Sequence, residues 1–431
     1  MTDLLTLSDD ELLDRLQRAA FSYFLNAYNP ANGLLADRSL TGSPCSIAVV
    51  GFALSSYPIA VDRGWMTRAD AAERTLVALR FFLSSAQNET PDATGYKGFY
   101  YHFLDMQSGK RVWRCELSLI DTTFLMAGML TASSYFIDSN QNETEIRKLA
   151  DALYRRVDWD WALNSKTTLS QGWKPECGFL HYGWEGYSEA SLLYVLALAS
   201  PTYPISANGY HGWTTTYQWE NLYGFDYLYA GPLFIHQFSH AWIDFRGIQD
   251  RFMRAKKSDY FENSRRATMI QREYAMRNPH SFRGYGEHFW GLSAGDGPEP
   301  QIVKIDGQIR RFFGYTARGV PYGADDGTIA PSATLASIVF APEMALAAVR
   351  HFHKYYPEIV NEFRLPSGFN PTLARDGSRG WLSEGYFGLD QGIVVLMIEN
   401  YRSQLTWKLM RQCPYIKAGL SNADFRGGWL E

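Results

Sequence analysis

Residues 44–87, PCSIAVVGFALSSYPIAVDRGWMTRADAAERTLVALRFFLSSAQ, hold two helical segments of opposite character. The first, residues 44–64, is almost entirely apolar, which predicts a helix that is buried on most of its sides. The second, residues 67–87, has one apolar face, and Thr67 followed by Asp70 is typical of a helix start. A short turn separates the two segments, so we expect a helical hairpin.

The alternation of apolar and amphipathic segments continues along the chain. Residues 8–28 predict an amphipathic helix that begins with a Ser8–Glu11 capping box. The later helices are expected at residues 116–137, 143–163, 187–199, 258–277, 332–355 and 390–411. Because inner helices touch neighbours on most sides and outer helices expose one face, this pattern favours an all-α toroid of two concentric helix rings.

The alternatives to a toroid are an irregular helical bundle and an α-solenoid. No motif of fixed length repeats, which weakens the solenoid, and no strong break in composition divides the chain. We therefore expect one domain over residues 1–431. Long loops rich in Gly, Trp, Tyr and acids lie between the helices, and we expect them to gather at one mouth of the toroid, where function is usual.

The bulk composition narrows the class of partner. The 431 residues are 46% hydrophobic and 20% charged, with a net charge of −4 and no basic block, so nucleic acid and anionic membrane are poor candidates. Aromatic residues reach 15% of the chain, and their rings can stack on sugar faces as well as fill a core. No signal peptide or transmembrane segment is recognisable, which predicts a cytoplasmic protein, or a periplasmic one if a leader was trimmed away.

Known cofactor and nucleophile motifs are missing from the sequence. The four cysteines form no C-x-x-C pair, and there is no P-loop, Rossmann fingerprint or G-x-S-x-G elbow. His236 and His240 stand four residues apart, with Asp244 one turn on, and are expected on one helix face. That spacing suits a metal, but the Glu of H-E-x-x-H is missing, so we predict neither metal nor cofactor.

Several carboxylates stand where a loop enters an apolar helix. Glycosidic bond cleavage needs one acid to protonate the leaving oxygen and one carboxylate to activate water or to attack. Partial burial keeps such groups at a useful pKa. Helix capping is the simpler, non-catalytic interpretation for these acids. For Asp121, the non-catalytic interpretation is a buried ion pair with an arginine such as Arg114. The acids at these junctions are Glu116, Asp121, Glu189, Asp325, Asp326 and Asp390.

The stretch GWEGYSEASLLY, residues 183–194, contains two of the candidate acids. Glu189 opens an apolar run and is interpreted as the catalytic acid. Glu185 lies in a Gly-flanked loop beside Trp184 and is better interpreted as a substrate contact. Ser188 is expected to hold the helix start that positions Glu189.

Laid out in order, these segments resemble the bacterial glucoamylase-like family that includes the endo-β-1,2-glucanases. The resemblance covers nearly the whole chain from about residue 18. It rests on segments such as GYKGFYYHFLDM, CELSLIDTTFLMAG, GYSEASLLYVLALASPTYPI, HQFSHAWIDFRGIQD, YGEHFWGLSAGDGP, YTARGVP, DDGTIAPSA and GLDQGIVVLMIENYRS. It implies an (α/α)6 barrel and endo-acting hydrolysis of a β-linked glucan, most of all β-1,2-glucan, with inversion at the anomeric carbon.

The resemblance also implies roles for single residues. Glu189 matches the likely general acid, and Asp121 matches an acid on a neighbouring inner helix. The glucanases have an additional acid in this helix, where Ser118, Leu119 and Ile120 stand in this chain. Glu116 lies at a shifted position. Activation of the attacking water is therefore assigned to Asp121 or Glu116. Stacking surfaces are expected from Trp184, Tyr187, Trp290 and Trp381, and hydroxyl contacts from Glu185, His240, Arg246, Glu287, Asp296, Arg318, Asp326 and Asp390.

Two other functions remain open on the sequence alone. The first is a sugar epimerase or isomerase that uses His236 and His240 as acid and base. The second is a carbohydrate-binding protein without catalysis. The expected partner in every case is a saccharide, and the oligomeric state is not predicted.

Overall fold

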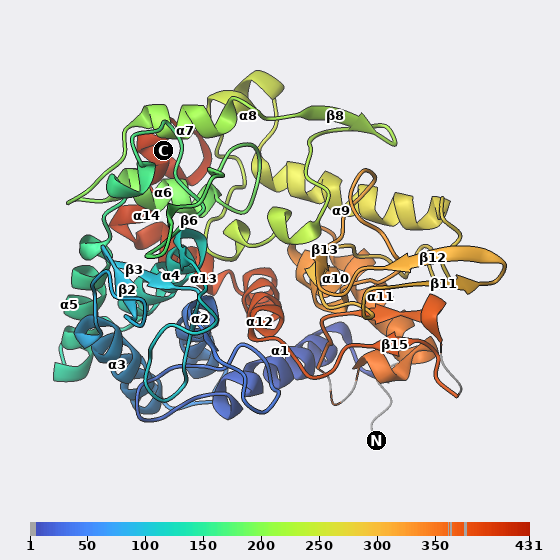
Figure 1. Cartoon of the computed structure of the whole chain (residues 1–431), viewed down its shortest axis with the longest axis horizontal. Helices are drawn as coiled ribbons and strands as arrows, with labels where there is room; N and C mark the ends of the chain where they lie inside the picture. Colours follow the sequence, from blue (N-terminus) through green and yellow to red (C-terminus); the bar gives the residue numbers. More distant parts are fainter. Residues whose placement is uncertain (1–5, 361, 363, 375–376) are drawn as a thin grey trace.

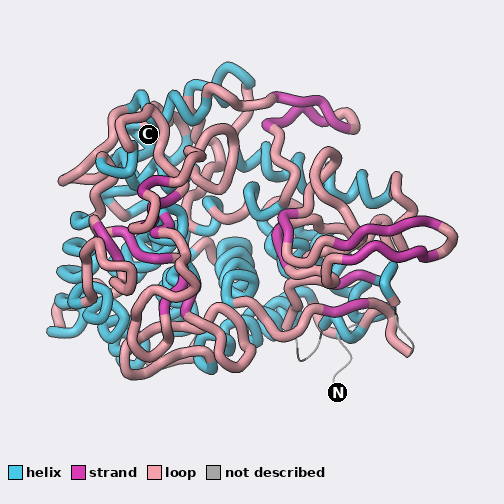
Figure 2. Tube along the Cα trace, in the orientation of Figure 1, coloured by secondary structure: helices cyan, strands magenta, loops and turns pink. Residues whose placement is uncertain are grey.

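The computed structural model describes residues 6–360, 362, 364–374 and 377–431. It is mainly helical with short strands (Figure 2). In Figure 1 the chain runs around the molecule from the blue N-terminal helices through green and yellow segments to orange ones, and the red helix α12 lies near the middle. The helices are α1 (Asp9–Asn26), α2 (Ile47–Asp62), α3 (Arg68–Ser84), α4 (Leu119–Tyr135), α5 (Gln141–Arg156), α6 (Ser191–Ala199), α7 (Ala207–Thr214), α8 (Arg251–Lys256), α9 (Tyr260–Arg277), α10 (Pro331–Ala336), α11 (Pro342–Tyr355), α12 (Gly388–Arg402), α13 (Leu405–Gln412) and α14 (Pro414–Asn422).

The helix starts predicted from capping residues are confirmed. Ser8 and Glu11 form a reciprocal capping box at α1, and the Thr67 side chain accepts the Asp70 N–H at α3. Helix α2 is buried from Ile47 to Ala60, as its apolar sequence predicts. The hairpin of α2 and α3 is therefore formed as expected.

Two long predicted helices are broken in the structure. The segment 332–355 splits because Pro342 lacks an N–H and begins a new helix, α11, after a short 3₁₀ turn. The segment 390–411 splits at Gln404, whose φ of 62° is left-handed and ends the helical path. Two other predicted helices are shorter, since α5 ends at Arg156 and α6 begins only at Ser191.

The apolar helices pack against one another in the interior. Helix α2 packs against α4 and α12, and α12 also packs against α1 and α10. The backbones of α2 and α4 touch at two glycines. A Cβ on Gly51 would lie 2.2 Å from the Phe124 carbonyl oxygen, and one on Gly128 would lie 2.1 Å from the Gly51 carbonyl oxygen. Neither position accepts a side chain unless the helices move apart.

Short antiparallel strands line the approaches to the inner helices. A five-stranded sheet has the order β2 (Gly95–Tyr96), β3 (Phe99–Tyr101), β5 (Leu117–Ser118), β6 (Gly172–Lys174) and β7 (Gly178–Phe179). Strands β1 and β5 run directly into α2 and α4, so their pairing fixes where those helices start. The two-stranded sheets pair β1 (Cys45–Ser46) with β4 (Phe103–Leu104), β8 (Trp219–Leu222) with β9 (Phe225–Leu228), β10 (Ala294–Gly295) with β13 (Thr316–Ala317), β11 (Gln301–Ile305) with β12 (Gln308–Phe312), and β14 (Phe369–Asn370) with β15 (Trp381–Leu382).

None of the described helices combines the length and the apolar character that a membrane span requires.

Candidate active site

Acidic side chains meet where the inner helices begin. Asp121 lies in the first turn of α4, Asp390 lies in the first turn of α12, and Glu189 lies in the turn just before α6. The charge of Asp121 acts on the Glu189 carboxyl, and the charge of Asp37 acts on Asp390. The helix entrances therefore bring together acids that are far apart in the sequence.

Glu189 is partly buried and keeps some exposure to solvent. Burial, with a smaller contribution from the Asp121 charge, raises the pKa of Glu189 to about 7. Its backbone is fixed by Ser239, whose hydroxyl donates to the Glu189 carbonyl at 2.8 Å and accepts the Leu192 N–H at 3.1 Å. Ser188 contributes only a 3.4 Å contact with the Ala190 N–H, so it is a weaker cap than predicted.

His102 joins two of the candidate catalytic acids. Its Nδ1 lies 2.8 Å from Glu116 Oε1 and its Nε2 lies 3.6 Å from Asp121 Oδ2. Although burial opposes it, the charges of Asp121, Glu116 and Asp37 raise the pKa of His102 to about 9, so the imidazole is protonated at neutral pH. Asp121 also accepts a hydrogen bond from the Ser118 hydroxyl, which in turn caps the first turn of α4.

The predicted ion pair between Asp121 and Arg114 is wrong. Arg114 points instead to Glu176, at 3.6 Å, and its side chain is largely exposed. Asp121 takes its positive partner from His102, which the sequence pattern did not single out.

Arg38 lies between two further acids, Asp37 and Asp296. We call these two acids, together with Asp121, Glu189 and Asp390, the acidic cluster. Arg38 Nε lies 3.7 Å from Asp37 Oδ2, and Arg38 Nη1 lies 3.6 Å from Asp296 Oδ2. Burial raises the pKa of Asp37 and of Asp390 to about 6 each, and it also raises the pKa of Asp296. Burial thus moves the pKa of all three acids above the ordinary value of an aspartate.

His102, Glu116 and Asp121 also form the one group in the described part of the chain whose side chains could hold a metal ion. Their candidate ligand atoms all lie within 4.8 Å of one another. A metal would have to displace the proton that the neighbouring acids hold on His102, since a ligating imidazole is neutral. The arrangement is better suited to holding a proton between two carboxylates than to holding a metal.

Replacing His102 with Gln is expected to move the acidic limb of the pH profile upward. Burial tends to raise the pKa of Glu116, but the hydrogen bond and charge of His102 outweigh it and lower that pKa. Without the imidazolium, the paired carboxylates stay ionised only at higher pH, so kcat/KM falls at acidic pH and recovers near neutrality. The measurement is kcat/KM against pH, with the exposed His280→Gln as control; identical profiles for all three proteins would refute the link.

The prediction that His236 and His240 share one helix face is wrong. They lie in two separate 3₁₀ turns, Leu233–His236 and Ser239–Ala241, and both are buried. His236 Nε2 contacts the Ala230 carbonyl at 3.1 Å and His240 Nε2 contacts the Ser264 hydroxyl at 3.0 Å. Burial lowers the pKa of His236 to about 4 and that of His240 to about 3, so both are neutral core side chains, and the hydroxyl contact predicted for His240 has no access to solvent.

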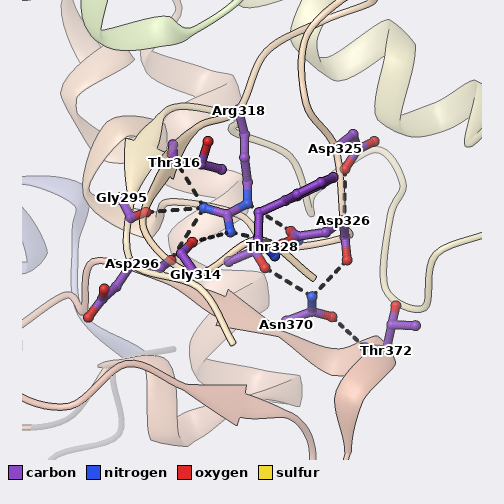
Figure 3. Close-up of polar contacts among 12 residues, drawn as sticks. Gly295, Asp296, Gly314, Thr316, Arg318, Asp325, Asp326, Thr328, Asn370 and Thr372 are labelled. Carbon is purple, nitrogen blue, oxygen red and sulfur yellow. Dashed lines mark hydrogen bonds and ion pairs between the residues drawn. The ribbon is translucent and has the colours of Figure 1, made fainter. Parts of the chain in front are cut away.

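Arg318 and Asp326 are not free to bind a sugar hydroxyl as predicted. Figure 3 shows the Arg318 guanidinium facing Asp326. Arg318 Nε and Nη2 donate to the two carboxylate oxygens at 2.7 and 2.9 Å. Arg318 also donates to the carbonyls of Gly295 and Gly314. The side chains of Arg318 and Asp326 are 1% and 0% exposed. The pair is an internal clamp that ties together the loops around residues 295, 314 and 326.

The remaining predicted contacts differ in how they are placed. Trp290 is only 1% exposed, so its ring has no free face for stacking, and Arg246 is paired with Asp244 at 2.8 Å. Glu287 is exposed and pairs with Arg272. The residues that keep partial or full exposure and remain candidates for substrate contact are Trp184, Glu185, Tyr187, Arg246, Glu287, Asp296, Trp381 and Asp390.

Three site residues were missed by the sequence reasoning: Asp37, Arg38 and His102. Asp37 and Arg38 lie in the long loop between α1 and β1, which carries no helix-entry pattern. His102 stands between β3 and β4 in the aromatic segment GYKGFYYHFLDM, where the single imidazole among rings was the available signal.

Comparison with known proteins places the chain among its relatives. The Glycoamylase family model, described as "Putative glucoamylase", matches residues 181–414, which is more than half of the chain. The chain belongs to the Glycoamylase family. A crystal structure from Bacteroides uniformis ATCC 8492, described in the same words, shares 31% identity and a TM-score of 0.87, covering 99% of this chain and 100% of that one.

Two other relatives of this Glycoamylase chain carry more specific names. An endo-beta-1,2-glucanase from Chitinophaga pinensis, in complex with sophorotriose and glucose, is 28% identical with a TM-score of 0.83, covering 99% of this chain and 100% of that chain. An exo beta-1,2-glucooligosaccharide sophorohydrolase (non-reducing end) from Parabacteroides distasonis is 29% identical over 450 residues. That match covers 96% of this chain and 58% of the relative, so the chain spans little more than half of that protein's length.

Proposed function

We propose that this Glycoamylase chain is a glycoside hydrolase that cleaves β-1,2-glucan, with Glu189 as the general acid. The observation that supports it best is a carboxyl whose pKa is raised to about 7 by burial and by the charge of a second acid, Asp121. An acid with that pKa keeps its proton near neutral pH and can pass it to a leaving oxygen. The names of the Chitinophaga and Parabacteroides relatives point to β-1,2-linked glucan as the substrate.

In the proposed reaction, Glu189 gives its proton to the glycosidic oxygen as the bond from that oxygen to the anomeric carbon breaks. A water molecule attacks the anomeric carbon from the opposite face, which inverts its configuration, and a carboxylate takes the proton of that water. We assign the carboxylate to Asp121, since Asp121 is the acid whose charge acts on Glu189. Glu116 is the alternative, because it shares the His102 proton.

The same proposal includes the architecture of the whole domain and the choice between endo and exo cleavage. The interior packing of α2 on α4 and α12, and the circuit of the chain in Figure 1, support an (α/α)6 double ring whose inner helices start at the acidic cluster. Endo action is supported by the name of the Chitinophaga relative, while the Parabacteroides relative is named as exo-acting. We favour endo action because the chain matches the Chitinophaga structure over the full length of both.

The test is a product profile on linear β-1,2-, β-1,3-, β-1,4- and α-1,4-glucans, with NMR of the anomeric protons at early time. The proposal expects reducing ends from β-1,2-glucan only, a mixture of product lengths, and the α-anomer first. A single disaccharide product contradicts endo action, and the β-anomer contradicts inversion. Binding of glucan without any reducing ends would identify a carbohydrate-binding protein instead.

A further inference from the structure

A groove lies beside the acidic cluster, outside the residues that the proposed reaction uses. Its volume is about 920 Å³, and it is enclosed by the loop that follows α1 and by the loop between β4 and β5. We call it the Trp113 groove, and it is lined among others by Tyr28, Asn29, Arg38, Ser43, Asp105 and Trp113. A volume of this size is within the range of pockets that hold whole small-molecule ligands.

The Trp113 groove meets the candidate active site at Arg38. Arg38 lines the groove and also reaches Asp37 and Asp296 of the acidic cluster. The His102 ring stacks on Phe103 with ring centroids 3.9 Å apart, and the Phe103 centroid lies 5.1 Å from that of Trp113. Arg38 and this row of rings therefore link the groove to the acids of the candidate active site.

The walls of the groove are held in place by internal hydrogen bonds. The side-chain amides of Asn29 and Asn32 donate to the Met106 carbonyl at 2.6 and 2.9 Å, which ties the two loops together. The Asp105 N–H donates to the Lys110 carbonyl at 2.7 Å and closes the turn before Trp113. A site that is fixed before its ligand arrives loses less entropy on binding.

The chemistry of the groove matches a sugar chain. Trp113 is 70% exposed, which is unusual for so large an apolar ring, and its φ of 56° places it in the left-handed region. Strained backbone of this kind is concentrated at functional sites. An open indole face surrounded by amides, hydroxyls and carboxylates provides what a glucosyl unit needs, one apolar face and several hydrogen-bonding partners.

We propose that the Trp113 groove binds further glucosyl units of the same β-1,2-glucan chain, beyond the two that flank the cleaved bond. This inference rests on the proposed function, because the ligand is that substrate. Trp113 stacks on one sugar ring, and Arg38 binds its hydroxyls. The groove thereby makes affinity depend on chain length.

The experiment measures binding by calorimetry in the Glu189→Gln background, using a β-1,2-gluco-oligosaccharide series of increasing length. Adding Trp113→Ala is expected to weaken binding of the long oligosaccharides about threefold to tenfold, the worth of one aromatic stacking contact, and to leave the shortest bound ligand unchanged. The control is Tyr203→Ala, which removes another exposed ring after the far end of α6. Near-UV circular dichroism checks that each variant is folded.

The outcomes separate the two proposals. Equal affinity of the Trp113→Ala and parent proteins at every length overturns the groove while leaving the proposed hydrolase intact. A uniform loss at all lengths also overturns it, because the ring would then act at the cleavage site itself. Absence of binding to any β-1,2-gluco-oligosaccharide overturns the proposed function and the groove together.

Discussion

Replacing Glu189 with Gln is expected to lower kcat on β-1,2-glucan by about 10²–10⁴-fold, the usual contribution of a general acid. The amide keeps the shape of the side chain and its backbone contacts through Ser239, but it has no proton to give. Substrate affinity should therefore change little. The measurement is release of reducing ends at saturating glucan, with Glu343→Gln on the surface of α11 as the matched control.

The pH dependence gives a second readout of the same residue. Burial raises the pKa of Glu189 to about 7, so the reactive, protonated form is present below that pH and is lost as pH rises through it. The wild-type kcat/KM should fall tenfold per pH unit well above 7. Wild-type turnover by Glu189→Gln, or a profile that stays flat to pH 9, would contradict the assignment of the acid.

Removing the carboxylate of Asp326 is expected to cost about 3–5 kcal/mol of the free energy of unfolding. Asp326→Ala leaves the Arg318 guanidinium buried without its counter-charge, and it also strands the N–H groups of Phe313 and Thr328 that Asp326 accepts. The measurement is the denaturant midpoint followed by intrinsic fluorescence. The cost arises from an unpaired buried charge, not from the strength of the pair itself.

Two further variants test the physical reason for that cost. The double variant Arg318→Met/Asp326→Leu removes both charges and should recover much of the lost stability, because no charge is left unpaired. Glu273→Ala breaks the exposed ion pair with Arg277 and should cost less than about 1 kcal/mol. If Asp326→Ala is no more destabilising than Glu273→Ala, the clamp does not hold these loops together.

The fold was predictable where one local signal decided each element. The capping box at Ser8 and the apolar run of α2 each needed only a few neighbouring residues, and both were correct. The breaks near Pro342 and Gln404 were missed because the apolar periodicity continues across them. Pro342 was a signal in the sequence for a new helix, whereas only the left-handed backbone angle of Gln404 reveals the second break. The short strands were missed as well, because two-residue pairings depend on contacts across the fold.

Three acids of the candidate site were found from the sequence, but Asp37 and the basic partners of the acids were not. Glu189, Asp121 and Asp390 were found because each stands before or within the first turn of a helix. The meeting of His102 with Glu116 and Asp121 depends on the register of β3 with β5, which the sequence pattern does not encode. The burial of Arg318 and Asp326 was missed for the opposite reason, since charged residues in a Gly-rich loop usually face solvent.

The contact between Gly51 and Gly128 ties catalysis to the spacing of two helices. Gly128 stands about two turns along α4 from Asp121, so the backbone contact fixes the height and tilt of the turn that carries this carboxylate. A methyl group at either glycine would push α4 outward as a rigid rod and carry Asp121 away from Glu189. In the proposed reaction, two residues without any functional group thus help to hold the carboxylate that activates water in its place.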